Sequence, residues 1–195
     1  MAIKPGWREE HLGTQWDLRS KETVNMLNAV ELFTRKALFN RDQPAFLILV
    51  GMPQTGKTQL AKAAFEYWRR GSITAYDSGR WKYPPKYTFA PWSDLANVNP
   101  EDRSKIYLWE DLSKAQLAVI DDIGSEVDRF KSGQTTENLR LILEARLTGR
   151  KFTIITTNIP PTQWDSKWDI RVTGRLLRDY KLVSTLNTES FSKTR

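Results

Sequence analysis

The sequence has no cysteine, one histidine and no long apolar run. Without cysteine the chain forms no disulfide, no thiolate metal site and no cysteine nucleophile, and we assign no role to His11. No stretch approaches the roughly 20 apolar residues that a membrane span needs, so we expect no membrane contact. The first seven residues lack the apolar centre of a signal peptide. These absences together predict a cytoplasmic protein.

The composition is that of an ordinary globular protein. Its 195 residues are 39% hydrophobic and 27% charged, which suits one domain with its own core. We therefore expect a single domain made of an N-terminal segment and helix (1–44), a core (45–180), and a C-terminal strand and tail (181–195). The net charge of +7 favours a polyanionic partner, although a basic surface alone is the alternative.

The clearest apolar patterns alternate between strands and helices. Helical stripes cover 21–40, 58–70 and 136–148, and Gly71 and Gly149 are the expected stops of the last two. Short apolar runs at 45–50, 117–120 and 152–156 are typical of strands buried on both faces of a parallel sheet. This alternation predicts an α/β fold, a three-layer sandwich around a parallel sheet of about five strands.

Weaker patterns complete the expected order of elements. The segment 73–76 is a plausible second strand, and 78–100, rich in proline, glycine and aromatics, is expected to be a long ordered loop. Helices are expected at 161–168 and 170–179, and a last strand at 182–186.

A glycine-rich loop follows the first apolar strand, where residues 51–58 read Gly-Met-Pro-Gln-Thr-Gly-Lys-Thr. In such a loop backbone N–H groups surround phosphate oxygens, the lysine neutralises the β and γ phosphates, and the last hydroxyl binds Mg²⁺. A chance glycine turn is the alternative, but the position between strand and helix argues against it. The sequence therefore predicts an ATP site made by Gly51, Pro53, Gln54, Thr55, Gly56, Lys57 and Thr58.

Two carboxylates follow the buried run 117–120. Asp121 is expected to hold Mg²⁺ together with Thr58, and Asp122 to orient or deprotonate the attacking water. An acidic turn at a strand end is the plainer interpretation. Downstream of a phosphate loop, however, such a pair is the expected partner.

Polar residues at two later positions extend the candidate site. Asn158 follows the strand 152–156, and strand ends of a parallel sheet point toward the ligand crevice, so its amide can position water or the γ phosphate. Arg171 and Arg175 are four residues apart and share a helix face, which suits phosphate recognition. Alternatively, the two arginines lie on a solvent-exposed helix face and form ion pairs with Asp169 or Asp179.

Read together, these motifs resemble the AAA+ helicase-loader and initiator clade, to which DnaC, DnaA and the transposition helper IstB belong. The resemblance runs from about Phe46 to Asp179 and rests on 51–58 as Walker A, on Ile-Asp-Asp-Ile-Gly at 120–124 as Walker B, and on Thr-Thr-Asn at 156–158. It implies that Asn158 is the sensor 1 residue. It further implies that Arg175, or failing that Arg171, reaches the nucleotide of a neighbouring subunit as an arginine finger.

The resemblance also implies a function. ATP would lie between the subunits of a homo-oligomeric ring or spiral, and hydrolysis would alter its grip on single-stranded DNA or on a client, a replicative helicase or a transposase. A helicase-loader-like or initiator-like role in DNA replication is expected first and an IstB-type transposition role second. A small-molecule kinase and a nucleotide-switched binding protein with little turnover remain alternatives of other classes.

Three departures from the clade are expected. A separate helicase-docking domain and the small helical lid are reduced or absent, and the extra DNA-facing helix is not recognisable. In place of that helix the sequence has aromatic and basic residues, among them Trp81, Lys82 and Lys86. These side chains either bind single-stranded DNA by stacking and phosphate contact or pack an irregular loop onto the sheet.

Overall fold

A five-stranded parallel sheet organises the protein. The computed structural model describes residues 21–39, 45–98, 106–126 and 133–184. The strands are β1 (Phe46–Val50), β2 (Tyr87–Pro91), β3 (Leu117–Ile123), β4 (Phe152–Thr157) and β5 (Tyr180–Ser184). They lie in the order β2-β3-β4-β1-β5, with every described pairing parallel. This confirms the predicted fold class.

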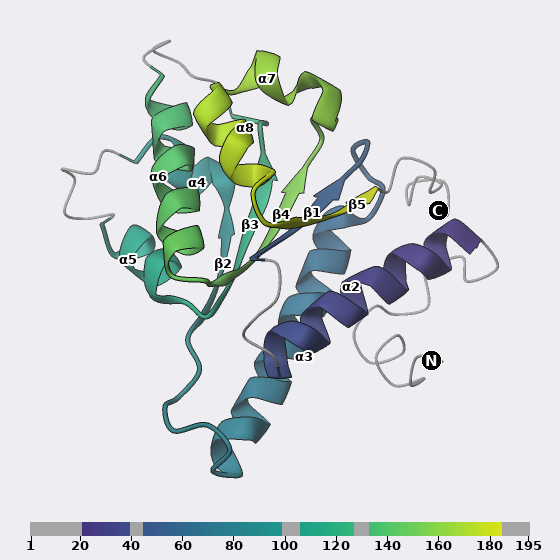
Figure 1. Ribbon diagram of the computed structural model, residues 1–195, viewed down its shortest axis with the longest axis vertical. Coiled ribbons are helices and arrows are strands. Elements are labelled where there is room, and N and C mark those ends of the chain that lie inside the picture. Colours follow the sequence, from purple (N-terminus) through teal and green to yellow (C-terminus); the bar gives the residue numbers. More distant parts are fainter. Residues whose placement is uncertain (1–20, 40–44, 99–105, 127–132, 185–195) are drawn as a thin grey trace.

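Helices cover both faces of the sheet (Figure 1). On one face lie α2 (Lys21–Phe39) and α3 (Lys57–Asp77). On the other lie α4 (Trp92–Ala96), α5 (Ile106–Lys114), α6 (Gln134–Thr148), the 3₁₀ turn η1 (Pro161–Gln163), α7 (Trp164–Lys167) and α8 (Ile170–Leu176). No helix in these described segments is both long enough and apolar enough to cross a membrane.

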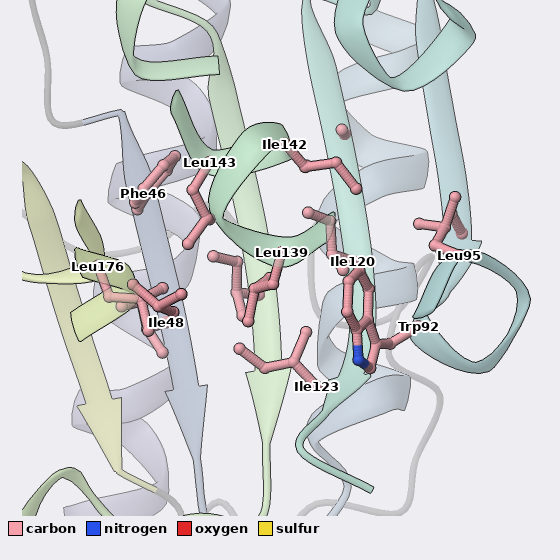
Figure 2. Close-up of a cluster of buried hydrophobic side chains, with 14 of the residues drawn as sticks. Phe46, Ile48, Trp92, Leu95, Ile120, Ile123, Leu139, Ile142, Leu143 and Leu176 are labelled. Carbon is pink, nitrogen blue, oxygen red and sulfur yellow. The ribbon is translucent and has the colours of Figure 1, made fainter. Parts of the chain in front are cut away.

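Side-chain alternation along the strands divides the core between the two faces. In β1, Leu47 and Leu49 face α2 and α3, whereas Phe46 and Ile48 face the opposite layer, because successive strand residues point to opposite sides. Figure 2 shows this second layer, in which β1 and β3 side chains meet residues of three helices: Trp92, Leu95, Leu139, Ile142, Leu143 and Leu176. Both layers are close-packed apolar clusters, so they fix the sheet that positions the strand ends.

The predicted strand at 73–76 and the predicted helix stop at Gly71 are wrong. Helix α3 continues through Gly71 to Asp77, and Ala75 remains on its buried face. Gly71 marks a close approach: a Cβ there would lie 2.5 Å from Leu38 Cδ2 of α2. The glycine therefore lets two helices approach each other within one layer, and it does not end the helix.

The predicted long loop at 78–100 is also wrong within its described part, which ends at Val98. It contains β2 and α4. Strand β2 lies at the edge of the sheet and begins after Pro84 and Pro85, and it ends on Pro91, which an edge strand tolerates. Trp92 and Leu95 of α4 are fully buried against the sheet.

The remaining elements match their predicted positions to within a few residues. Helix α6 ends at Gly149 as expected, and the last strand is β5, two residues earlier than predicted. The expected helix 170–179 is the shorter α8, and α5 was not predicted at all.

Candidate functional site

The phosphate loop joins the carboxyl end of β1 to the first turn of α3. Gly56 has a φ of 84° and Gln54 a φ of 64°, both in the left-handed region that glycine adopts freely. Gly51 is buried, and its N–H donates to the carbonyl of Thr157 on the neighbouring strand over 3.3 Å. The loop is thus fixed at its base to the sheet, and its later N–H groups precede a helix start that favours anions.

Lys57 lies inside this loop with only 6% of its surface exposed. Its Nζ donates to the carbonyl oxygens of Gly51, at 2.9 Å, and Met52, at 2.7 Å. Burial lowers the pKa of the ammonium, while the Asp122 and Asp121 carboxylates oppose that shift. The charge is held in place by the backbone, so it is available to an anion bound in the loop.

Asp121, near the carboxyl end of β3, connects the loop to the sheet. Its carboxylate accepts from the Thr58 hydroxyl at 3.0 and 3.1 Å, and from the Thr156 hydroxyl at 2.7 Å. Because both hydroxyl protons point at the carboxylate, the lone pairs of Thr58 remain free for another partner. A hydroxyl and a carboxylate oxygen side by side are the hard ligands that suit Mg²⁺.

A β-bulge brings the second carboxylate into the site. Between β3 and β4 the register moves from Ile120 opposite Ile155 to Ile123 opposite Thr157, so β3 contains one extra residue. Asp122 has a φ of 63°, and its N–H donates to the Thr156 hydroxyl at 2.8 Å. In a regular strand Asp121 and Asp122 would point to opposite faces, and the bulge removes that constraint.

Asn158 completes the cluster from β4. Its Nδ2 donates to Asp122 Oδ1 over 2.8 Å. Strand β4 lies between β1 and β3, so its carboxyl end is the one place that borders both the phosphate loop and the acidic pair. The structure therefore brings together five predicted residues from three separate segments: Lys57, Thr58, Asp121, Asp122 and Asn158.

Comparisons with known proteins agree with this topology. Neither protein-family models nor curated protein sequences match the chain. Among solved structures, a DnaC helicase loader matches with a TM-score of 0.68 at 21% identity, over 93% of this chain and 99% of that one. A DnaI structure matches with a TM-score of 0.67 at 16% identity, over 93% and 94% of the two chains. DnaA bound to AMPPCP and single-stranded DNA matches with a TM-score of 0.62 at 16% identity, over 94% of this chain and 51% of that one.

What these proteins share with the chain is the arrangement of sheet and helices. Both loader structures match over 93% of this chain. The chain has the AAA+ fold. The AAA+ resemblance inferred from the motifs is thereby confirmed at the level of fold, with the site at the carboxyl ends of the parallel strands.

Thr156 belongs to the same hydrogen-bonded cluster, and sequence reasoning missed it. It is 1% exposed and contacts Asp121 and Asp122 at once. The signal was present: Thr156 lies at the carboxyl end of β4, two residues before Asn158. Assigning a role to Asn158 thus pointed to Thr156 as well.

The two candidate finger arginines lie on α8, which packs against α6. Arg171 donates through Nε and Nη2 to Asp169 at 2.7 to 3.0 Å, while Arg175 donates to the carboxylate of Glu144 and, at 2.6 Å, to the carbonyl of Arg171. Within the described segments, none of these partners belongs to the phosphate loop. In these segments neither arginine is therefore hydrogen-bonded to its own chain's loop, and Arg171 forms the ion pair with Asp169 that the sequence offered as the alternative.

The aromatic and basic residues proposed for DNA lie at the other end of the sheet. The Trp81 ring is half-buried against Trp68, with centroids 5.8 Å apart, and Lys82 Nζ lies 5.2 Å from the centroid of the Tyr83 ring. The Lys86 N–H donates to the side-chain Oε1 of Gln116, the residue before β3, and the Lys86 carbonyl accepts from the Gln116 N–H. These contacts place Trp81 and Lys86 at the amino ends of the strands, opposite the acidic pair.

Proposed function

We propose that this AAA+ domain binds Mg²⁺-ATP at residues 51–58 and hydrolyses it, acting in DNA replication as a helicase-loader-like or initiator-like oligomer. One observation carries the chemistry: Thr156 links the Thr58–Asp121 pair to the Asp122–Asn158 pair, so that these side chains form one hydrogen-bonded cluster beside the phosphate loop. A small-molecule kinase has no need of an asparagine that holds a second carboxylate there. The observed cluster therefore favours water as the acceptor.

Each side chain has a task in hydrolysis. Backbone N–H groups of the loop and Lys57 bind the β and γ phosphates, and Thr58 and Asp121 hold Mg²⁺. When bound, Mg²⁺ supplies charge neutralisation at the phosphate oxygens. Asp122 orients the attacking water and accepts its proton, while the amide of Asn158 fixes the carboxylate that does so.

A further positive charge at the nucleotide is proposed to come from a neighbouring subunit of the oligomer. Arg175, with Arg171 as second candidate, is proposed to reach the nucleotide of a neighbouring subunit, because in the described segments their hydrogen-bond partners all lie outside their own phosphate loop. An arginine acting in trans is worth roughly 10³ to 10⁵ in rate, so turnover depends on oligomer formation.

The polymer and the client follow from charge and from the similar proteins. The net charge of +7 favours nucleic acid, and one similar structure is DnaA bound to single-stranded DNA. Another is a DnaC helicase loader. We therefore propose single-stranded DNA as the polymer and a replicative helicase as the protein client.

The test is ATP turnover per subunit over a range of protein concentrations, with and without single-stranded DNA. Lys57→Ala is the background control, because it removes the charge that binds the phosphates. Turnover that rises with concentration and with DNA supports the proposal. Turnover that is independent of both contradicts the assembled, DNA-directed ATPase, and a phosphorylated small molecule in place of free phosphate would make the protein a kinase.

A further inference from the structure

A groove lies at the end of the sheet opposite the nucleotide site. Its walls come from the last turn of α2, from α3, and from the chain just before β3 and β4, and Phe39, Trp68, Trp81, Gln116, Arg150 and Lys151 are among the residues that line it. Its volume is about 390 Å³, within the range of roughly 300 to 1,000 Å³ usual for ligand sites. No residue of the proposed ATPase site contributes to it.

Aromatic rings form one part of the groove. Phe39, the last residue of α2, is 65% exposed, so its ring is accessible at the groove. Trp81 is half-buried and is held by the Trp68 ring at a tilt of 57°. One exposed ring and one partly exposed, fixed ring are the surfaces on which nucleobases stack.

Positive charge surrounds these rings. Arg150 is exposed in a turn of positive φ (47°), and exposed Lys86 is bonded through its backbone to groove residue Gln116. Lys151 has a pKa lowered first by burial and then by the neighbouring cations Arg146 and Lys86. Arg146 is itself fully buried, where its guanidinium donates to the carbonyls of Ala115 and Phe152.

We propose that this groove binds single-stranded DNA, with bases stacked on Phe39 and Trp81 and phosphates bound by Arg150 and Lys86. The proposal deepens the DNA role above and rests on it, since it gives that role a location. A cationic groove with aromatic walls fits a single strand better than a duplex, whose bases are already stacked. It also fits a nucleic acid better than an acidic peptide, which has no use for the rings.

Position makes this site compatible with ATP hydrolysis. Phe152 in the groove begins β4, and Asn158 in the ATPase site follows the end of that strand, so the two sites lie at opposite ends of one buried strand. DNA in the groove leaves the phosphate loop open. Groove variants can therefore be examined with the ATPase site intact.

The experiment is a titration of fluorescent oligo-dT followed by anisotropy at several salt concentrations. The charge-reversal variant combines Lys86→Glu and Arg150→Glu, and its matched control combines Lys167→Glu and Arg178→Glu, which are exposed and lie outside the groove. We expect at least about a tenfold loss of affinity and a shallower salt dependence in the groove variant. Phe39→Ala is expected to lose about fivefold or more with an unchanged salt slope, because it removes stacking only.

Each result distinguishes the two proposals. If the wild-type protein does not bind oligo-dT, the DNA role itself fails. If it binds and the groove variant binds like the control, only the groove proposal is overturned. Displacement of oligo-dT by polyglutamate at equal charge concentration would also overturn it, since the rings would then contribute nothing. Equal melting temperatures of the variants and wild type check that the fold is retained.

Discussion

At the scale of single residues, Thr156 is hydrogen-bonded to both members of the acidic pair. Its hydroxyl donates to Asp121 Oδ1 at 2.7 Å and accepts from the Asp122 N–H at 2.8 Å. One buried hydroxyl thus fixes the rotamer of the first carboxylate and the backbone of the second. We regard Thr156 as a positioning residue, because it acts on bound Mg²⁺ and water only through these two aspartates.

Thr156→Val keeps the shape of the side chain and removes both hydrogen bonds. Residues that hydrogen-bond to a metal ligand typically contribute about 10- to 100-fold to metal affinity. We therefore expect the Mg²⁺ concentration needed for half-maximal nucleotide binding to rise by about that factor. The measurement is equilibrium binding of a non-hydrolysable ATP analogue over a Mg²⁺ series. Thr156→Ser should restore affinity, since it keeps the hydroxyl. Equal Mg²⁺ dependence in the valine variant and wild type would remove the assigned role.

Two glycines provide a matched test of backbone strain. Gly124 has a φ of 89°, and a Cβ there would lie 2.7 Å from Ile159 Cγ1 and 3.1 Å from Trp168 Cζ2. Gly124→Ala is therefore expected to lower the free energy of unfolding by at least about 1 to 2 kcal/mol. Gly174→Ala, in α8 with no heavy atom within 4 Å of its Cβ, should raise it by about 0.5 to 1 kcal/mol. Denaturant titration measures both, and equal effects would contradict the strain argument.

At the scale of secondary-structure elements, α8 is stabilised by the contacts of its N-cap residue, Asp169. Asp169 caps the helix by accepting from the Arg171 N–H at 2.6 Å and also binds the Arg171 guanidinium. These bonds hold the pKa of Asp169 down to about 2. A carboxylate with a lowered folded-state pKa stabilises the protein above its unfolded pKa, and that contribution is lost as the pH falls toward 2.

Asp169→Ala should therefore lower the melting temperature at pH 7 and do so less and less as the pH approaches 2. The difference is expected to be modest, because the carboxylate is at the surface. Thermal melts of variant and wild type from pH 2 to 7 provide the measurement. A difference that stays constant over this range would mean that the ionised cap contributes nothing.

The elements differ in how well the sequence predicted them, for physical reasons. Buried on both faces, β1, β3 and β4 consist of apolar runs, so their positions and the phosphate loop between strand and helix were evident from local pattern. Gly71 was wrongly predicted to end a helix, because the reason for a glycine there is its close approach to Leu38 of α2, which is distant in the sequence. The bulge at Asp122 and the contacts of Thr156 likewise arise from pairing of β3 with β4, which no local pattern encodes.

At the scale of the whole molecule, Arg175 tests whether subunits complete one another's sites. Arg175→Ala should leave ATP binding nearly unchanged and reduce turnover by about 10³-fold or more, because only the transferring phosphoryl group needs the guanidinium. Its matched control is Arg140→Ala, which breaks a similar ion pair with Glu137 on α6. The measurement is turnover per subunit at a concentration where the wild-type rate has reached its plateau. Unchanged turnover in Arg175→Ala would end the finger assignment.

The order of strands in the sheet also bears on how the protein is made. Strand β1 pairs on one side with β4 and on the other with β5, so Phe46 lies opposite Thr153 and Tyr180. During synthesis the strand that carries the phosphate loop leaves the ribosome early, yet both of its neighbours emerge late. Such long-range pairing slows folding and leaves an apolar strand exposed meanwhile. We therefore expect a nucleotide that needs the ordered loop to bind only after β4 and β5 have paired with β1.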